Sequence, residues 1–179
     1  MPTWVALLRA VNLVSHNRVS MPKLREALAG SGFGTVRTYV NSGNVVLDSP
    51  LRSPAKVAAA IHDVIVEHFG VDTPVIVRTG RQLAEVLAWN PFPAAVDRQP
   101  KLVAVIHLAA EPAPAAVEEV LAADVSPDEI AVRGSEVVVA WAKGTGNPKT
   151  DRVLRRIGVE GTARNWRTLT ALVEMTSSR

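Results

Sequence analysis

Short apolar runs alternate with segments of helical period along the first half of the chain. Residues 4–11 are apolar except for one arginine, and such a run predicts a strand that is covered on both faces. Residues 22–29 and 54–69 repeat their apolar positions every three or four residues, which predicts two helices, and Ser53 with Pro54 is a typical beginning for the second. Further apolar runs predict strands over residues 35–41, 44–48 and 74–78. The predicted order is β-α-β-β-α-β.

The same order of elements returns in the second half. Residues 101–109 predict an apolar strand, residues 112–121 predict a helix, and Asn147 with Pro148 begins another helix that ends near residue 157. Strands are predicted over residues 130–133, 136–139 and 159–164, and a last helix over residues 167–175. Between the halves, Thr-Gly-Arg-Gln at residues 79–82 is a capping box that predicts a short helix, followed by a linker.

Each half contains a predicted β-hairpin. Ser42 and Gly43 separate two predicted strands in the first half, and Gly134 and Ser135 do so in the second. Two residues of turn type between apolar runs are typical of a two-residue hairpin turn. We therefore expect a tight turn in both halves.

The repeated order predicts an α+β protein made of two ferredoxin-like βαββαβ repeats with antiparallel sheets, plus a linker helix and a C-terminal helix. The expected divisions are residues 1–78, 79–100 and 101–179. Continuous apolar runs at residues 103–106 and 137–139 indicate that the sheet face opposite the helices is also covered. Either the other half or a second copy of the chain could cover it, so a monomer and a homodimer are both open.

The expected topology brings distant loops to one end of each sheet. In a βαββαβ repeat the first two strands run the same way and the third runs back. The loop after the first strand, the hairpin turn and the loop before the fourth strand therefore share an end. In the first half these segments are residues 12–20, 41–44 and 72–73, which are polar and rich in asparagine. Such convergence is what a binding site needs.

Composition narrows the class of protein. The 179 residues include no cysteine, which excludes disulfides, thiolate zinc sites and a cysteine nucleophile. No apolar run approaches the roughly 20 residues that a membrane helix needs, and the first residues lack the basic segment of an export signal. We therefore expect a cytoplasmic protein without membrane association. No dinucleotide fingerprint or metal-ligand spacing occurs, so no cofactor is predicted.

The net charge of +3 is small, but its distribution is uneven. Residues 1–50 carry five basic and two acidic side chains, residues 51–142 carry seven and twelve, and residues 143–179 carry eight and three. The excess of basic residues at both ends is mostly arginine, whose planar fork suits phosphate and carboxylate. Solvated helix faces are the alternative explanation, because most surface charge has no specific partner.

The first candidate cluster combines amides, a hydroxyl and one guanidinium. Its members are Arg9, Asn12, Asn17, Asn41, Ser42 and Asn44. They offer hydrogen bonds to a nucleotide or another phosphorylated ligand. The asparagines of the hairpin could equally bond to the backbone of their own turn, as asparagine commonly does. Arg9, at the end of an apolar strand, indicates either an anion site or a structural pair.

The second candidate cluster lies at the opposite sheet end in the second half. Its members are Lys149, Arg164 and Asn165. Residues 144–150 resemble a phosphate loop in context, but Pro148 stands where that motif needs glycine and supplies no amide hydrogen. A capped helix start is the simpler interpretation for Lys149. Asn165 could cap the last helix, and Arg164 is the preferred binding candidate.

Several stretches resemble a family of bacterial proteins known as domain of unknown function 1697. They are ALLRAVNL at residues 6–13, Asn17, Met21, TYVNSGNV at residues 38–45, the Asn-Pro-Phe linker at residues 90–92 and TARNWRT at residues 162–168. The resemblance covers nearly the whole chain in order and spacing. It implies an α+β fold with two related halves and no established activity.

Three functions remain open at this point. The first is a binding module for a phosphorylated small molecule or nucleic acid, which uses loop amides and arginines. The second is a small-molecule enzyme with His16 or Arg164 in the site, since His16 is the one histidine in a polar loop. The third is a dimeric interaction protein without a ligand. Base stacking on the sheet is disfavoured, because the first and third strands carry aliphatic residues where RNA-binding sheets carry aromatics.

Overall fold

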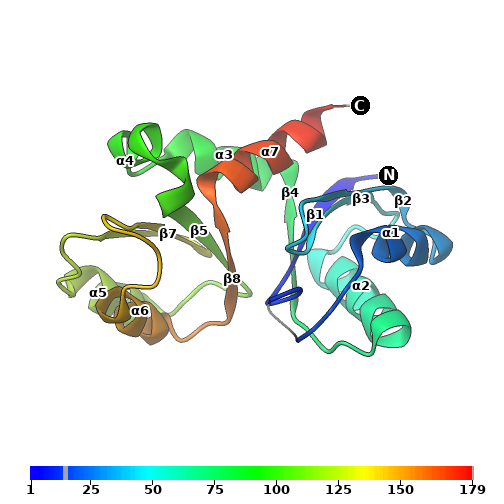
Figure 1. Cartoon of the computed structure of the whole chain (residues 1–179), viewed down its shortest axis with the longest axis horizontal. Coiled ribbons are helices and arrows are strands. Elements are labelled where there is room, and N and C mark those ends of the chain that lie inside the picture. The colour runs from blue at the N-terminus through cyan, green and yellow to red at the C-terminus, as the bar shows by residue number, and fades with distance from the viewer. Residues whose placement is uncertain (14–15, 179) are drawn as a thin grey trace. The chain divides into compact units, whose positions relative to one another are not determined.

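The computed structural model describes residues 1–13 and 16–178. The chain divides into two compact units, Met1–Glu85 with Ala171–Arg179, and Val86–Thr170. Each unit contains one four-stranded antiparallel sheet with the strand order of a βαββαβ repeat. The predicted α+β fold class is therefore confirmed (Figure 1).

The sheet of the first unit has the order β2-β3-β1-β4. Its elements are β1 (Thr3–Leu8), α1 (Met21–Gly30), β2 (Gly34–Tyr39), β3 (Asn44–Asp48), α2 (Pro54–Phe69) and β4 (Val75–Thr79). Trp4, Ala6 and Leu8 of β1 face α1 and α2 and belong to the same buried cluster as Leu24 and Ile61 of those helices. The alternate apolar residues of β1 and the apolar faces of α1 and α2 thus pack in one core.

The sheet of the second unit has the order β6-β7-β5-β8. Its elements are β5 (Val103–Leu108), α5 (Pro114–Ala122), β6 (Glu129–Arg133), β7 (Glu136–Ala140), α6 (Pro148–Leu154), the 3-10 turn η2 (Arg155–Ile157) and β8 (Gly161–Asn165). The remaining elements are α3 (Gly80–Trp89), α4 (Pro93–Arg98), the 3-10 turn η1 (Pro100–Leu102) and α7 (Trp166–Ser177). The segment expected as an irregular linker thus forms α4 and η1, each of which begins at a proline.

The sheet faces opposite the repeat helices are buried in both units. Val5, Leu7 and Val46 in the first sheet, and Val105 and Val138 in the second, have no exposed surface. This burial confirms the expectation that both faces of each sheet are covered. At one edge of the first sheet, α7 contacts β2, because the Arg37 guanidinium of β2 donates to the Met175 carbonyl of α7 at 2.5 Å.

The two halves match residue by residue where the fourth strand of each repeat ends. Arg78 pairs with Val5 in the first sheet, and Arg164 pairs with Val105 in the second. The next residue caps a helix in both halves. Thr79 and Gln82 exchange bonds of 3.1 and 2.8 Å, which confirms the predicted capping box. Asn165 accepts a bond from the amide of Thr168 at 2.9 Å. The repeated unit therefore continues into α3 and α7.

The two hairpins differ, and the expectation of a two-residue turn is wrong for the first. Arg133 pairs with Glu136, so the second hairpin has the predicted turn at Gly134 and Ser135. Tyr39 pairs with Asn44 instead, which leaves the four residues 40–43 in the first turn. The physical reason is that Val40 adopts a left-handed conformation, with φ 49°, and so ends the strand early.

A close approach between α3 and α7 in the first unit requires glycine at position 80. A Cβ atom there would lie 2.7 Å from the Cβ atom of Thr176 and closer still to its hydroxyl. We therefore expect Gly80→Ala to lower the free energy of unfolding by about 1–3 kcal/mol. Gly30→Ala is the control, because its new methyl group meets no atom within 4 Å. Denaturant unfolding of both variants checks this, and equal stabilities would contradict the proposed steric cause.

Candidate functional site

Three connections converge at one end of the first sheet. The amide of Leu8 donates to the Gly43 carbonyl at 2.9 Å, and the amide of Arg9 donates to the Pro74 carbonyl at 3.1 Å. The Thr73 hydroxyl also donates to the Arg9 carbonyl. The convergence predicted from the topology is therefore present. We call the described residues 9–13, 16–20 and 40–43 the loop end.

Asn12 organises the loop end through its side-chain amide. Its Nδ2 donates to the carbonyls of Val19 at 2.8 Å and Asn41 at 2.9 Å, and its Oδ1 accepts from the amide of Val19 at 2.8 Å. Its own backbone amide donates to the Asn17 carbonyl at 3.0 Å. Asn12 thus joins two segments that are 29 residues apart in sequence. Asn12, which the sequence suggested only as a binding residue, thus has structural contacts, and a role for it in binding stays a prediction.

The other residues of the first cluster divide into buried and exposed groups. Asn44 is buried, and its Nδ2 donates to the Tyr39 carbonyl at 3.1 Å and the Ser42 hydroxyl at 3.0 Å. This amide therefore shapes the turn. Arg9, Asn17, Asn41 and Ser42 are exposed. The side chains of these four residues are accessible to solvent.

The loop end carries basic side chains and no carboxylate. Residues 9–20 and 40–43 include Arg9, His16 and Arg18 but neither aspartate nor glutamate, and all three basic residues are exposed. The neighbouring Asp72 contacts His62 of α2, whose Nε2 lies 2.8 Å from the carboxylate. Its hydrogen bond raises the pKa of His62 above the ordinary value. Asp72 is therefore the one carboxylate in the three connections at this end of the sheet, against the basic side chains Arg9, His16 and Arg18.

Comparison of the two repeats shows that the loop end is an elaboration of the first. The connection from β1 to α1 spans the twelve residues 9–20, whereas the equivalent connection from β5 to α5 spans the five residues 109–113. The first hairpin turn has the four residues 40–43, and the second has two. Because the second repeat forms the same sheet with shorter connections, the strand order does not require the additional residues. Two residues of the longer connection, Val11 and Val19, do belong to the buried core, whereas most of its polar residues are exposed.

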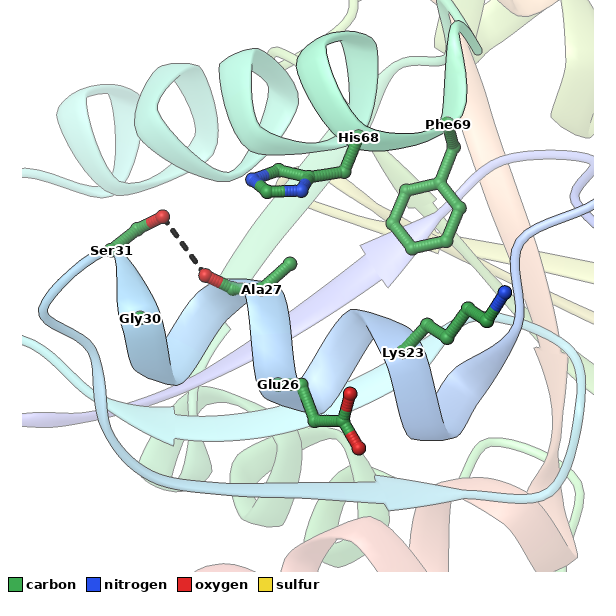
Figure 2. Close-up of a pocket in the computed structure, with 7 residues that line it drawn as sticks. All are labelled: Lys23, Glu26, Ala27, Gly30, Ser31, His68 and Phe69. Atoms are coloured by element: carbon green, nitrogen blue, oxygen red, sulfur yellow. Dashed lines mark hydrogen bonds between the residues drawn. The ribbon is translucent and has the colours of Figure 1, made fainter.

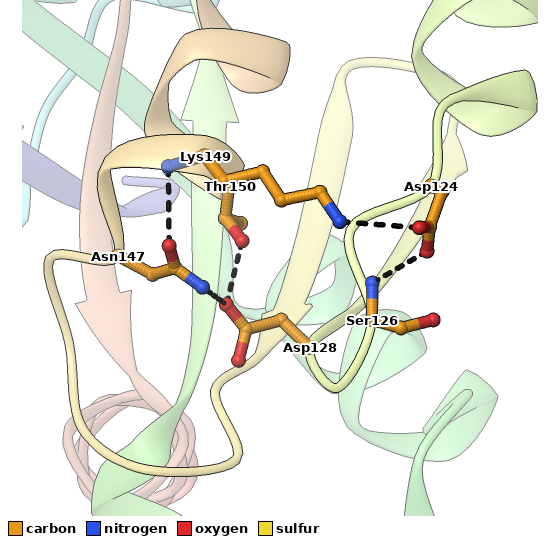
Figure 3. Close-up of polar contacts among 6 residues, drawn as sticks. All are labelled: Asp124, Ser126, Asp128, Asn147, Lys149 and Thr150. Atoms are coloured by element: carbon orange, nitrogen blue, oxygen red, sulfur yellow. Dashed lines mark hydrogen bonds and ion pairs between the residues drawn. The ribbon is translucent and has the colours of Figure 1, made fainter.

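The segment around Lys149 of the second cluster surrounds the carboxylate of Asp128, beside Asn147 and Thr150 (Figure 3). Asp128 is buried and accepts hydrogen bonds from the Thr150 hydroxyl at 2.6 Å, the Asn147 amide at 2.8 Å and the Ala142 backbone at 2.9 Å. Desolvation, the largest single influence, raises the pKa of Asp128, but these bonds and nearby Lys149 together lower it. An internal anion therefore already occupies the donors of this segment.

Lys149 lies at the edge of the same cluster. Its Nζ atom is 3.1 Å from the carboxylate of Asp124. The backbone amide of Ser126 donates to that carboxylate at 2.9 Å, and this bond, followed by Lys149, lowers the pKa of Asp124 to about 2. The capped helix start expected as the alternative is present, since Asn147 accepts from the amide of Lys149 at 3.1 Å.

Arg164 lies within β8 and is only 8% exposed. Its Nη1 donates to the Thr162 hydroxyl and the Ala163 carbonyl, both at 2.8 Å. Burial lowers the pKa of this guanidinium to about 10. Asn165 caps α7 as described above, and Trp166 is buried. All three residues thus make contacts within the fold, and a role for Arg164 or Asn165 in binding stays a prediction.

Pattern reasoning missed a groove between α1 and α2 (Figure 2). The groove has a volume of about 510 Å³ and is lined by Lys23, Glu26, Ala27, Gly30, Ser31, His68 and Phe69. His68 points toward α1, and the carboxylate of Glu26 points away from α2. No candidate from the sequence lines it. The signal was weak because lysine, glutamate and glycine on an exposed helix face are ordinary surface residues.

Neither a metal site nor a membrane-spanning helix is found in the described part of the chain. Within residues 1–13 and 16–178, histidine, aspartate and glutamate do not gather in groups of three that could hold a metal ion. Within the same residues, every helix is too short or too polar to cross a bilayer.

The fold and the loop end define an α+β protein with a duplicated ferredoxin-like unit and a polar, loop-built end on the first repeat. The chain belongs to the family described as protein of unknown function (DUF1697), whose model matches residues 1–137. This confirms the resemblance seen in the sequence. The matched residues include the whole loop end, whereas the TARNWRT segment lies beyond them.

A solved structure supports the fold along the whole chain. The conserved bacterial protein SP0830 from Streptococcus pneumoniae aligns with a TM-score of 0.73 and 18% identity over 99% of each chain. At this identity the likeness establishes the fold alone. No curated protein matches the sequence.

Proposed function

We propose that the protein binds a small phosphorylated molecule at the loop end of its first repeat. The observation that carries this proposal is the contrast between the repeats. Both additional segments of the first repeat, in the β1–α1 connection and in the first hairpin, lie at the same end of one sheet. Asn12 holds them together. Loops positioned by a rigid sheet are common sites of binding.

The charge of the loop end supports an anionic ligand. Arg9 and Arg18 are exposed there, and the same segments contain no carboxylate. Arg9, Asn17, Asn41 and Ser42 add guanidinium, amide and hydroxyl donors. Guanidinium and amide groups bind phosphate through charge-assisted and neutral hydrogen bonds. The second cluster is less suited to an anion, because Asp128 and Asp124 already occupy its donors.

Burial of the sheet faces favours a small molecule over nucleic acid. RNA-binding proteins of ferredoxin-like topology stack bases on aromatic residues of an open sheet. Here the corresponding face carries Val5, Leu7 and Val46, which are fully buried. Residues 9–20 and 40–43 contain no phenylalanine, tyrosine or tryptophan, and His16 alone could not stack a series of bases.

Substitution of Arg18 tests the proposal by calorimetric titration of the full chain. The probes are inorganic phosphate, ribose 5-phosphate, a nucleoside monophosphate and a short RNA. We expect at least one monophosphate to bind, and Arg18→Gln to weaken that binding about tenfold, as loss of one charge-assisted hydrogen bond does. Arg98→Gln is the matched control, because Arg98 is exposed on α4 in the other unit.

Three results would contradict the proposal. They are the absence of binding by every monophosphate, an equal loss of affinity in the Arg98→Gln control, and tighter binding of the RNA with a steeper dependence on salt. The last result would favour the nucleic-acid alternative, because many phosphate contacts produce a steep salt dependence.

A further inference from the structure

Two exposed apolar side chains flank the bond that closes the loop end. Leu13 and Val40 are 59% and 57% exposed. Leu13 follows Asn12 in sequence and Val40 precedes Asn41, and these two asparagines are joined by the bond of 2.9 Å described above. Five large apolar residues are exposed in the described part of the chain, and two of them are these. Neither side chain contributes to the buried cluster of the first unit.

Val40 also has a backbone conformation that its side chain disfavours. Its φ angle is 49°, in the left-handed region. A β-branched residue is a genuine outlier there, because Cβ and its two substituents crowd the adjacent backbone. Such residues persist only where surrounding contacts over-determine the conformation, and they cluster at functional sites.

Contacts on both sides of Val40 fix the backbone of the turn. The residue before it, Tyr39, accepts a bond from Asn44, and the residue after it, Asn41, accepts one from Asn12. Gly43 closes the turn onto β1, where an added Cβ atom would lie 2.7 Å from the side chain of Leu8. The turn is therefore fixed on both sides of Val40.

The second repeat shows that the fold does not require this strain. Its equivalent hairpin uses two residues, and Gly134 takes the left-handed position with φ 56°. Glycine adopts that conformation without steric cost. The first repeat thus keeps a strained, exposed valine where a glycine would meet the same backbone requirement, so the side chain itself calls for an explanation.

We infer that Val40 and Leu13 form an apolar contact surface for the organic part of the phosphorylated ligand. The ligand class is therefore a phosphate monoester with an apolar or aromatic group, rather than a polyhydroxylated sugar phosphate. This inference rests on the function proposed above, in which Arg9 and Arg18 contact the phosphate. The apolar side chains then contribute affinity by removing part of the organic group from water.

Paired titrations with phenyl phosphate and glycerol phosphate test the ligand class. We expect the wild-type chain to bind phenyl phosphate at least about threefold more tightly, the ratio that burial of a small apolar area produces. Val40→Gly is expected to remove this preference by lowering the affinity for phenyl phosphate. The same variant is expected to raise the melting temperature, because it relieves the left-handed strain.

The control has the same strain in a different place. Thr35 is also β-branched and exposed, with φ 44°, but it lies at the opposite end of β2 from Val40. Thr35→Gly is therefore expected to raise the melting temperature without changing the ratio of the two affinities. Val40→Asn is the second variant at the site, since asparagine tolerates the left-handed region and lacks the branched apolar side chain. It is expected to lose the preference for phenyl phosphate as Val40→Gly does.

The outcomes separate this inference from the proposed function. If both esters bind with equal affinity, or if Val40→Gly keeps the preference for phenyl phosphate, the inference is wrong and phosphate binding stands. If inorganic phosphate and both esters fail to bind, the proposed function is wrong and the inference is overturned with it.

Discussion

Replacing His107 with alanine is expected to lower the free energy of unfolding by about 3–5 kcal/mol, the cost of truncating a large side chain in a packed core. His107 of β5 has no exposed surface, and its Nδ1 lies 2.6 Å from a carboxylate oxygen of Glu136 on β7. The two atoms are in close contact without the alignment of a hydrogen bond. The substitution removes a large buried ring and leaves the carboxylate in a site that is almost closed to water.

The first repeat supplies a matched control for this variant. His107 pairs with Glu136 in the second sheet, and Leu7 pairs with Asn44 at the equivalent register of the first. The double substitution His107→Leu with Glu136→Asn copies the apolar and neutral pair. We expect it to recover most of the stability that His107→Ala loses in denaturant unfolding. A double variant as unstable as His107→Ala would show that the loss of packing at this pair of positions is not the cause.

Asp128→Ala is expected to lower the free energy of unfolding by about 2–4 kcal/mol, because hydrogen bonds to a charged group stabilise the fold more than neutral ones do. The carboxylate accepts from Thr150, Asn147 and Ala142, and so joins the connection before α6 to the start of β6. Thr150 is fully buried and would lose its hydroxyl acceptor. Thermal and denaturant unfolding at neutral pH measure the loss, with Asp97→Ala on the exposed face of α4 as the control.

The same variant makes a prediction about pH. The pKa of Asp128 is lower in the folded chain than in the unfolded one. A lowered folded pKa stabilises the protein above the unfolded value of about 3.9, and this stabilisation is lost as the pH falls through the folded pKa. The difference in stability between wild type and Asp128→Ala should therefore shrink below about pH 4. A difference that stays constant in acid would mean that the charge of Asp128 contributes nothing.

Local signals in the sequence were sufficient to predict the order of helices and strands. Ser53 caps α2 by accepting from the amide of Lys56 at 3.5 Å, and the capping box at Thr79 begins α3 as its pattern indicates. Such signals act within one helical turn, so neighbouring residues reveal them. The strand order followed from the repeated βαββαβ pattern, because few topologies join these elements without crossing connections.

The first hairpin shows where local rules stop. Ser42 and Gly43 fit a two-residue turn as well as Gly134 and Ser135 do. The decisive contact comes from Asn12, whose amide bonds the carbonyl of Asn41 from 29 residues away. No pattern within the hairpin contains that contact. The strain at Val40 was hidden from the sequence for the same reason.

Arg164 shows a second limit. An arginine in a short apolar strand is compatible with either an exposed strand end or a covered face. The register with Val105 places Arg164 on the face opposite the repeat helices, which is buried. One cannot see from periodicity alone that this face is covered at that position, because the covering residues are distant in sequence. For Asn41 and Asn44 of the first hairpin, both the structural and the binding alternative were apparent from the sequence, whereas the structural role of Asn12 was not.

Mapping of amide chemical shifts in the isotopically labelled full chain, during titration with phenyl phosphate, tests ligand binding at the loop end most directly. The largest shifts are expected at Asn17, Asn41 and Ser42, which are exposed beside the basic residues. Largest shifts at Ala27, Gly30 and Ser31 of the groove, or at Lys149 and Thr150 of the second cluster, would contradict the assignment of the site to the first repeat.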